Sequence, residues 1–246
     1  MAMDAASKRR APRRFVVVPA AGSGSRFRGS VPKQYADVGG RPLIERTLER
    51  LAILDADAIV VALAPEDSDF ARRIAPIPNV EAMRCGGATR ADTVRNALAT
   101  LAARSAEDDW ILVHDAARPC VPREALARLV DEIDDDGVGG LLALPLADTL
   151  KRGDGEAPSR VLRTEDRKGL WLAQTPQMFR YGLLRSAYAL DAAREATDDA
   201  QAIEHLAATG ACAMPRLVVG SAANIKVTYP EDVALATALF AHQEGP

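Results

Sequence analysis

The chain has 246 residues, of which 48% are hydrophobic, and this size suits one large α/β domain or two small ones. It carries 31 basic and 34 acidic residues, and the net charge of −3 gives no overall attraction to nucleic acid or to a membrane surface. No apolar run approaches the ~20 residues of a membrane-spanning helix. The three cysteines show no C-x-x-C spacing, so neither a disulfide framework nor a zinc site is indicated. We therefore expect a cytoplasmic protein in a reducing setting.

Residues 1–14 form a basic segment with five Lys and Arg residues. A signal peptide would continue into an apolar stretch and a small-residue cleavage site. Here the apolar run Phe15–Val18 leads directly into a glycine-rich loop. We interpret residues 1–14 as a disordered basic tail without a targeting role, and we predict a single domain over residues 15–241.

Short apolar runs rich in β-branched residues alternate with helical patterns along the rest of the chain. The runs predicted as strands are Phe15–Pro19, Ala58–Leu63, Val80–Arg84, Trp110–His114, Gly140–Leu146 and Met214–Val219. The patterns predicted as helices are Ile44–Ile53, Ser68–Ile74, Thr93–Ala102, Arg123–Ile133, Tyr181–Glu195, Asp198–Ala208 and a closing helix from Pro230 to about Phe240. This alternation predicts a three-layer, Rossmann-like α/β fold around a mostly parallel twisted sheet.

A polar stretch, residues 148–169, interrupts this alternation. Two glycines and Pro158 lie in its middle, and its flanks Thr149–Lys151 and Arg160–Arg163 have the pattern of short strands. We predict a β-hairpin arm that projects from the main sheet, in preference to a linker between two domains.

The first predicted strand ends in a loop with the chemistry of a phosphate-binding site. The loop reads P-A-A-G-S-G-S-R over residues 19–26, and P-K-Q follows over residues 32–34. Glycines let the backbone approach a phosphate and direct N–H groups toward it, while Arg26 and Lys33 supply positive charge. The loop is neither a dinucleotide fingerprint, because Phe27 stands at the third glycine position, nor a P-loop, because no Gly-Lys-Ser/Thr follows. Open α/β sheets bind ligands at the carboxyl ends of strands, so nucleotide binding is favoured over a plain tight turn.

Four further segments carry distinctive motifs. They are G-G-A-T-R-A-D-T-V over residues 86–94, H-D-A-A-R-P over 114–119, T-P-Q over 175–177, and N-I-K-V-T over 224–228 with P-E-D over 230–232. In this order, and with the glycine loop, they resemble the motifs of the 2-C-methyl-D-erythritol 4-phosphate cytidylyltransferase family, a branch of the sugar-phosphate nucleotidyltransferases. The resemblance implies transfer of CMP from CTP to 2-C-methyl-D-erythritol 4-phosphate. The products would be 4-diphosphocytidyl-2-C-methyl-D-erythritol and pyrophosphate, in the non-mevalonate isoprenoid precursor pathway.

The resemblance also implies roles for individual residues. The expected catalytic residues are Arg26, Lys33, Lys226 and Asp115. The residues expected to bind the nucleotide are Ala20, Ala21, Gly22, Gly24, Gly87, Ala88, Arg90 and Thr93. The residues expected to bind the acceptor are Asp115, Arg118, Thr149, Arg167, Thr175 and Thr197.

Two of these positions depart from the family pattern. Many members carry an acidic residue where this chain has Ala88, and Ser where it has Thr93. Backbone contacts to the base survive the first change, and a hydroxyl survives the second. Thr93 can alternatively cap the helix that follows, Asp115 can cap the next turn, and Arg90 can brace its loop.

The reaction places few demands on proton transfer. The attacking group is a phosphate oxygen that is anionic near neutral pH, so catalysis consists mainly of positioning and charge neutralisation. We therefore assign no catalytic role to His114, His205 or His242. The resemblance implies Mg²⁺ held mainly by the CTP phosphates, and an all-protein cage for the ion is not expected. It also implies a homodimer whose arm carries Arg167 of one chain to the acceptor site of the other.

Two alternatives remain open. The acceptor could be a pentitol phosphate such as ribitol 5-phosphate, because the sequence separates the two acceptors poorly. A non-catalytic nucleotide-binding module is a second alternative, against which the retention of Arg26, Lys33 and Lys226 argues.

Overall fold

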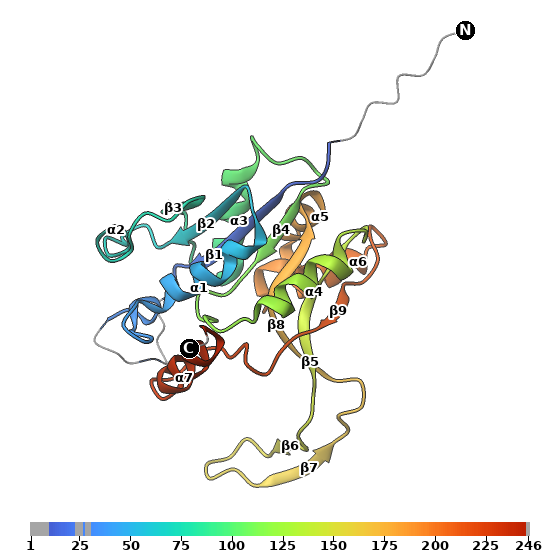
Figure 1. Cartoon of the computed structure of the whole chain (residues 1–246). Helices are drawn as coiled ribbons and strands as arrows, with labels where there is room; N and C mark the ends of the chain where they lie inside the picture. Colours follow the sequence, from blue (N-terminus) through green and yellow to red (C-terminus); the bar gives the residue numbers. More distant parts are fainter. Residues whose placement is uncertain (1–9, 23–26, 28–30, 245–246) are drawn as a thin grey trace.

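The computed structural model describes residues 10–22, 27 and 31–244. Within this part of the chain, seven strands form one mixed sheet in the order β3-β2-β1-β4-β8-β5-β9 (Figure 1). They are β1 (Arg14–Ala20), β2 (Ala58–Leu63), β3 (Val80–Met83), β4 (Trp110–Val113), β5 (Gly139–Pro145), β8 (Trp171–Arg180) and β9 (Arg216–Val219). Neighbouring strands pair in parallel except at β8, which runs antiparallel to both β4 and β5. The predicted mostly parallel α/β sheet is confirmed.

Helices cover both faces of the sheet (Figure 1). They are α1 (Leu43–Leu51), α2 (Phe70–Arg73), α3 (Arg90–Leu101), α4 (Arg123–Ile133), α5 (Tyr181–Tyr188), α6 (Asp199–Ala207) and α7 (Asp232–Glu244). Short 3-10 turns cover Lys33–Tyr35, Ala52–Leu54 and Asp191–Glu195. No helix in the described ranges is long and apolar enough to cross a membrane.

Strand β1 shows how the sheet supports two cores. Successive side chains of a strand point to opposite faces. Val16 and Val18 pack with α1 and α4 on one face, whereas Phe15 and Val17 pack with α3, α5 and α6 on the other. All four side chains are at most 1% exposed. Burial on both faces requires a continuous apolar run, which is why the sequence pattern predicts this strand.

Strand β8 is absent from the sequence-based prediction, which is wrong at this point. The buried half of β8 contains Gln174, Pro176 and Gln177, whereas a central strand is expected to be apolar and free of proline. The polar groups of both glutamines have partners. The Gln174 amide pairs with the backbone of Ser221, and Gln177 pairs with the start of α6. The Gln177 amide donates to the Asp198 carboxylate at 3.0 Å and accepts from the Ala200 backbone N–H at 2.7 Å.

Several predicted boundaries also change, including the end of one helix and the start of the first strand. The helix expected over Tyr181–Glu195 ends at Tyr188, and its last part is a separate 3-10 turn. Strand β1 begins at Arg14, inside the segment expected to be a tail. Arg10 donates two hydrogen bonds to the buried carboxylate of Asp109, at 2.9 and 3.0 Å, which holds this segment against the start of β4. Residues 1–9 of the expected tail lie outside the described residues.

The predicted arm is present as a separate two-stranded sheet. Strands β6 (Leu150–Gly153) and β7 (Val161–Glu165) pair antiparallel and project from the main body (Figure 1). Val161 and Leu162 on β7 are 66% and 61% exposed, respectively.

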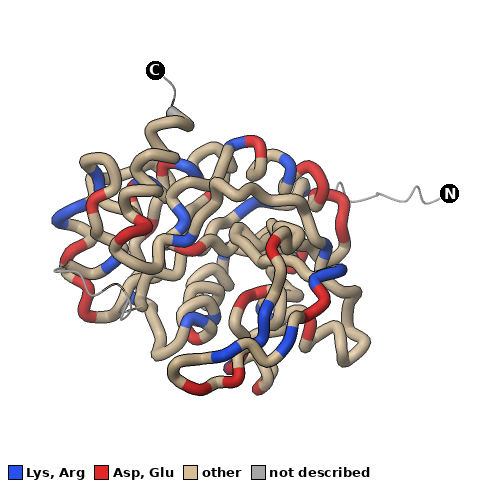
Figure 2. The backbone as a smooth tube through the Cα atoms, turned by 90° about the horizontal axis from the view of Figure 1, so that it is seen from below, with Lys and Arg blue, Asp and Glu red and all other residues tan. Residues whose placement is uncertain are grey.

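Figure 2 shows the charged residues along the backbone. Over the described residues, Lys and Arg alternate with Asp and Glu, and no extended region of one sign is visible. This distribution agrees with the near-balanced composition.

Candidate active site

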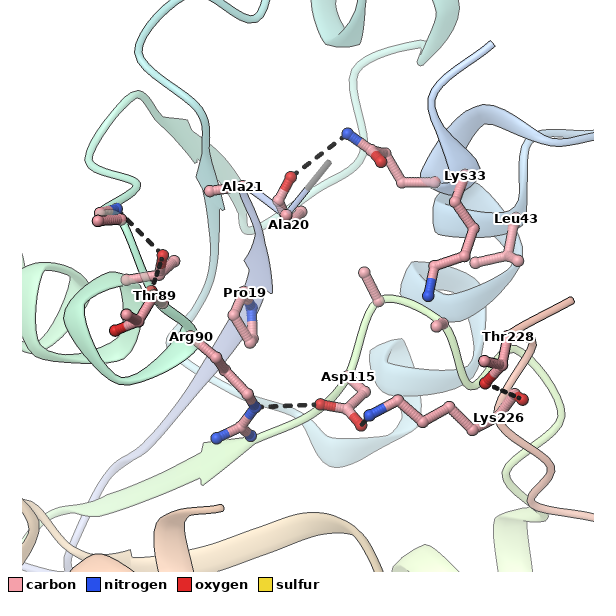
Figure 3. Close-up of a pocket in the computed structure, with 17 residues that line it drawn as sticks. Pro19, Ala20, Ala21, Lys33, Leu43, Thr89, Arg90, Asp115, Lys226 and Thr228 are labelled. Atoms are coloured by element: carbon pink, nitrogen blue, oxygen red, sulfur yellow. Dashed lines mark hydrogen bonds and ion pairs between the residues drawn. The ribbon is translucent and has the colours of Figure 1, made fainter. Parts of the chain in front are cut away.

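A cavity of about 530 Å³ opens where the carboxyl ends of β1 and β4 meet. Strands β2 and β3 lie on one side of β1 and β4 lies on the other, so the strand order reverses between β1 and β4. This position is the topological switch point of the sheet. The cavity is lined by Pro19, Ala20, Ala21, Gly22, Lys33, Gln34, Leu43, Gly87, Ala88, Thr89, Arg90, Thr93, Asp115, Ala116, Ala117, Lys226 and Thr228 (Figure 3).

The loop between β3 and α3 forms one wall and lies very close to the loop after β1. A Cβ atom added at Gly86 would lie 2.3 Å from the Cβ of Ala21, so only glycine allows this approach. The Thr93 hydroxyl accepts from the Gly87 N–H at 3.0 Å and donates to the Thr89 carbonyl at 2.9 Å. The hydroxyl proton of Thr93 is therefore donated within the loop, and the two hydrogen bonds of this hydroxyl fix the conformation of the loop. Thr89, rather than Thr93, caps α3 by accepting from the Asp92 N–H.

Asp115 is the centre of the charged cluster on the floor of the cavity (Figure 3). Its carboxylate lies 2.8 Å from Lys226 Nζ, 3.3 Å from Arg90 Nε and 3.6 Å from Arg118 Nε. Burial raises the pKa of Asp115, but the positive charges of Arg90 and Lys226 outweigh this effect and hold the pKa well below its usual range. The carboxylate is therefore ionised near neutral pH.

Arg90 joins this cluster to a second buried carboxylate. Its Nη2 atom donates to Asp199 Oδ2 at 2.7 Å, and the Tyr188 hydroxyl donates to Asp199 Oδ1 at 2.5 Å. Asp199 is fully buried at the start of α6. Burial lowers the pKa of Arg90, but the negative charges of Asp199 and Asp115 have the larger effect and raise the pKa above its usual value. The guanidinium therefore stays charged. Sequence reasoning missed Asp199 and Tyr188, because nothing local to either residue indicates a partner in α3.

Lys33 lies on the opposite wall, where its side chain points into the cavity (Figure 3). The two residues that follow Lys33 in the same 3-10 turn are fixed by hydrogen bonds. Gln34 donates to the Ala20 carbonyl at 3.4 Å, and the Tyr35 hydroxyl donates to Asp67 at 2.7 Å. The first contact holds the turn against the end of β1, and the second holds it against the segment that follows β2.

The structure brings most of the predicted site residues together. Ten of them line the cavity: Ala20, Ala21, Gly22, Lys33, Gly87, Ala88, Arg90, Thr93, Asp115 and Lys226. Arg118 and Thr175 contact Asp115 but do not line the cavity themselves. Thr149, Arg167 and Thr197 are exposed and do not line the cavity, while Gly24 and Arg26 lie outside the described residues.

Comparisons with known proteins agree with this geometry. The family model described as IspD, 2-C-methyl-D-erythritol 4-phosphate cytidylyltransferase, matches residues 15–242. The enzyme of that name from Dechloromonas aromatica is 52% identical over 232 residues, covering 93% of this chain and 98% of the relative. The enzyme from Laribacter hongkongensis is 52% identical over 228 residues, covering 92% and 95%.

Two solved structures extend the likeness to three dimensions. A 4-diphosphocytidyl-2C-methyl-D-erythritol synthase is 40% identical with a TM-score of 0.80, covering 94% of this chain and 99% of the other. The Francisella tularensis 2-C-methyl-D-erythritol 4-phosphate cytidylyltransferase is 30% identical with a TM-score of 0.76, covering 92% and 99%.

Proposed function

This chain belongs to the 2-C-methyl-D-erythritol 4-phosphate cytidylyltransferase family, and we propose that the cavity at the ends of β1 and β4 is its active site. The enzyme transfers CMP from CTP to 2-C-methyl-D-erythritol 4-phosphate and releases pyrophosphate, in the non-mevalonate isoprenoid pathway. The observation that carries the assignment of the site is the cavity itself. It joins a glycine-rich wall, Lys33, and the ionised Asp115 with its paired Lys226.

The chemistry matches this set of side chains. A phosphate oxygen of the acceptor attacks the α-phosphorus of CTP, and a new P–O bond forms. The bond from that phosphorus to the bridging oxygen breaks, and its electron pair leaves with pyrophosphate. No proton moves in this step, so fixed cations are more useful than a general base. Lys33 can stabilise the negative charge that develops on the phosphates. Lys226 can stabilise negative charge between the α-phosphate and the acceptor.

Asp115 has a different task in this proposal. Its carboxylate is held from three sides, so it can orient Lys226 and accept a hydrogen bond from an acceptor hydroxyl. The backbone of Gly87 and Ala88 is the proposed reader of cytosine. A polar site that pairs with one base edge rejects a base with the opposite pattern. CTP should therefore be used much faster than UTP, and equal rates would contradict this assignment of the loop.

The site fits a Mg²⁺ ion that arrives with the nucleotide. Among the described residues, no group of three or more His, Cys, Asp or Glu side chains could hold a metal ion. The carboxylate of Asp115 is already paired with cationic side chains. Mg²⁺ commonly keeps water and phosphate oxygens as ligands, so a protein cage is not needed. When bound, the ion neutralises charge on the triphosphate.

We also propose that the arm completes the acceptor site of a second copy of the chain. Two-stranded ribbons are marginally stable alone, and the exposed Val161 and Leu162 give this one an apolar surface to bury. A two-fold dimer would let each arm reach the other chain. Arg167 would then bind the acceptor phosphate, for which the planar guanidinium is well suited.

Pyrophosphate release gives the direct test of the proposed reaction. CTP and Mg²⁺ are incubated with the enzyme and either 2-C-methyl-D-erythritol 4-phosphate or ribitol 5-phosphate. We expect faster release with the first acceptor. Faster release with ribitol 5-phosphate would favour the pentitol alternative, and no release with either acceptor would favour a binding module.

Mixing two inactive variants tests the shared site. In a heterodimer of Lys33→Ala and Arg167→Ala, one site receives both defects and the other receives neither. Activity should return to about half of normal per heterodimer if the two sites act independently. Verified heterodimers that stay as inactive as the parents would show that Arg167 does not act across the dimer.

A further inference from the structure

His114 belongs to a motif but has no role in the reaction as described above. It follows β4, is fully buried, and lies beside Asp115. Its Nδ1 atom is 3.1 Å from the Thr175 hydroxyl, and its Nε2 atom is 3.1 Å from the Arg118 carbonyl oxygen. Both ring nitrogens therefore have partners, although the side chain does not line the cavity.

For a neutral imidazole, these partners allow a single proton arrangement. A carbonyl oxygen can only accept, so Nε2 carries the imidazole proton and donates to Arg118. Burial lowers the pKa of His114 to about 4, so the ring is neutral near neutral pH and Nδ1 is an acceptor. The Thr175 hydroxyl must then donate to Nδ1.

The same hydroxyl accepts from the Asp115 backbone N–H at 3.0 Å. The hydrogen bonds thus run in one direction, from Asp115 to Thr175, then to His114, and finally to the Arg118 carbonyl. Thr175 keeps one lone pair and no proton. In this arrangement it cannot donate to a phosphate oxygen, which limits the acceptor-binding role expected for it.

A second set of contacts closes the array. The Asn224 amide donates to the Thr175 carbonyl at 2.8 Å, and Arg118 Nη1 donates to the Asn224 carbonyl at 2.6 Å. Asn224 is fully buried and lies two residues before Lys226. The array therefore joins the segments that carry Asp115 and Lys226.

We propose that His114 is a positioning residue, whose neutral Nε2–H form orients Thr175 and thereby fixes the backbone of Asp115 in the active site. This proposal rests on the proposed site of cytidylyl transfer. It assigns to the imidazole no contact with substrate and no proton transfer. Its effect on the reaction passes entirely through the direction of two hydrogen bonds.

Nuclear magnetic resonance of the wild-type enzyme tests the proton arrangement without any substrate. The chain has three histidines, so a ¹⁵N-labelled sample gives a simple long-range ¹H–¹⁵N spectrum. His205→Gln and His242→Gln identify the other two rings and should leave turnover unchanged. We expect His114 to show an unprotonated Nδ1 and a protonated Nε2 at pH 7. A protonated Nδ1, or an average of two tautomers, would overturn the proposal even if the enzyme is active.

Kinetics of matched variants test the consequence. Thr175→Val removes the hydroxyl at similar volume, and Thr175→Ser keeps it. We expect Thr175→Val and His114→Phe each to lower kcat by about tenfold or more, as loss of a buried hydrogen bond implies, with little change in KM for CTP. The double variant should be no slower than the slower single variant, because both interrupt one array.

Thr175→Ser should recover most of the wild-type kcat. If Thr175→Val turns over as fast as Thr175→Ser, the positioning role is wrong. If His114→Phe does not fold, the spectrum and the Thr175 pair still decide the matter. Failure of the wild-type enzyme to release pyrophosphate would instead contradict the proposed reaction, and it would not alter the expected spectrum.

Discussion

Helix α5 contains two tyrosines whose comparison isolates the contribution of the buried Asp199. Tyr181 and Tyr188 are 2% and 4% exposed, and each hydroxyl donates to a buried acceptor. Tyr188 donates to the Asp199 carboxylate at 2.5 Å, whereas Tyr181 donates to the neutral Leu98 carbonyl at 3.4 Å. Burial raises the pKa of Tyr188, so the phenol keeps the proton that it donates. Replacement of each tyrosine by Phe removes one hydroxyl and nearly conserves the volume.

The expected costs differ because one acceptor is charged. A hydrogen bond to a charged group contributes about 1.5–3 kcal/mol, and a neutral bond about 0.5–1.5 kcal/mol. The long bond of Tyr181 should lie near the bottom of its range. We expect Tyr188→Phe to lower the free energy of unfolding by about 2 kcal/mol, roughly 1 kcal/mol more than Tyr181→Phe. Asp199→Asn should cost more, about 3 kcal/mol, because it removes the fully buried one of the two carboxylate partners of Arg90, while Asp115 stays in place.

Urea unfolding at pH 7 measures these differences through the midpoint at constant m-value. All variants need the same protein concentration, because the proposed dimer would make the midpoint depend on concentration. The reasoning fails if Tyr188→Phe is no more destabilising than Tyr181→Phe. It also fails if Asp199→Asn is neutral, since loss of the fully buried partner of Arg90 would then cost nothing.

Three further predictions concern the active site and its surroundings. Lys33→Ala should lower kcat by about 10²–10³ and weaken CTP binding much less, as measured by pyrophosphate release and by CTP titration; near-normal turnover in a folded variant would remove Lys33 from the catalytic set. Activity should disappear in EDTA and return with added Mg²⁺, whereas full turnover in chelator would show that cationic side chains suffice. The free energy of unfolding should fall as the pH drops from about 6.5 to about 4, because the pKa of His114 is lowered to about 4 and the unfolded chain takes up the proton first. This contribution reaches at most about 3 kcal/mol and is fully present above pH 6.5. It should vanish in His114→Gln, and an unchanged pH dependence of the unfolding free energy in that variant would contradict it.

The sequence alone determined the parallel part of the fold and the position of the residues that follow β1. Strands β1, β2 and β4 are continuous apolar runs, because both of their faces are buried, and such runs are visible without any knowledge of their neighbours. Ala21 and Gly22 follow β1 directly, so local order is enough to place them at the carboxyl edge of the sheet. The arm was also predictable from its own sequence, because its polar and glycine residues interrupt the apolar pattern.

The tertiary structure decided what depends on residues that are distant in the chain. Strand β8 inserts antiparallel between β4 and β5, although Pro176 and two glutamines argue against a central strand. The strand is tolerated because Gln177 finds partners at the start of α6 and Gln174 pairs with the backbone of Ser221. The Arg90–Asp199 pair joins residues 109 positions apart, and the His114–Thr175 bond joins residues 61 positions apart. A buried polar side chain is tolerated only with its partner in place. No local pattern carries that information, because the partner is brought near only when the sheet has formed.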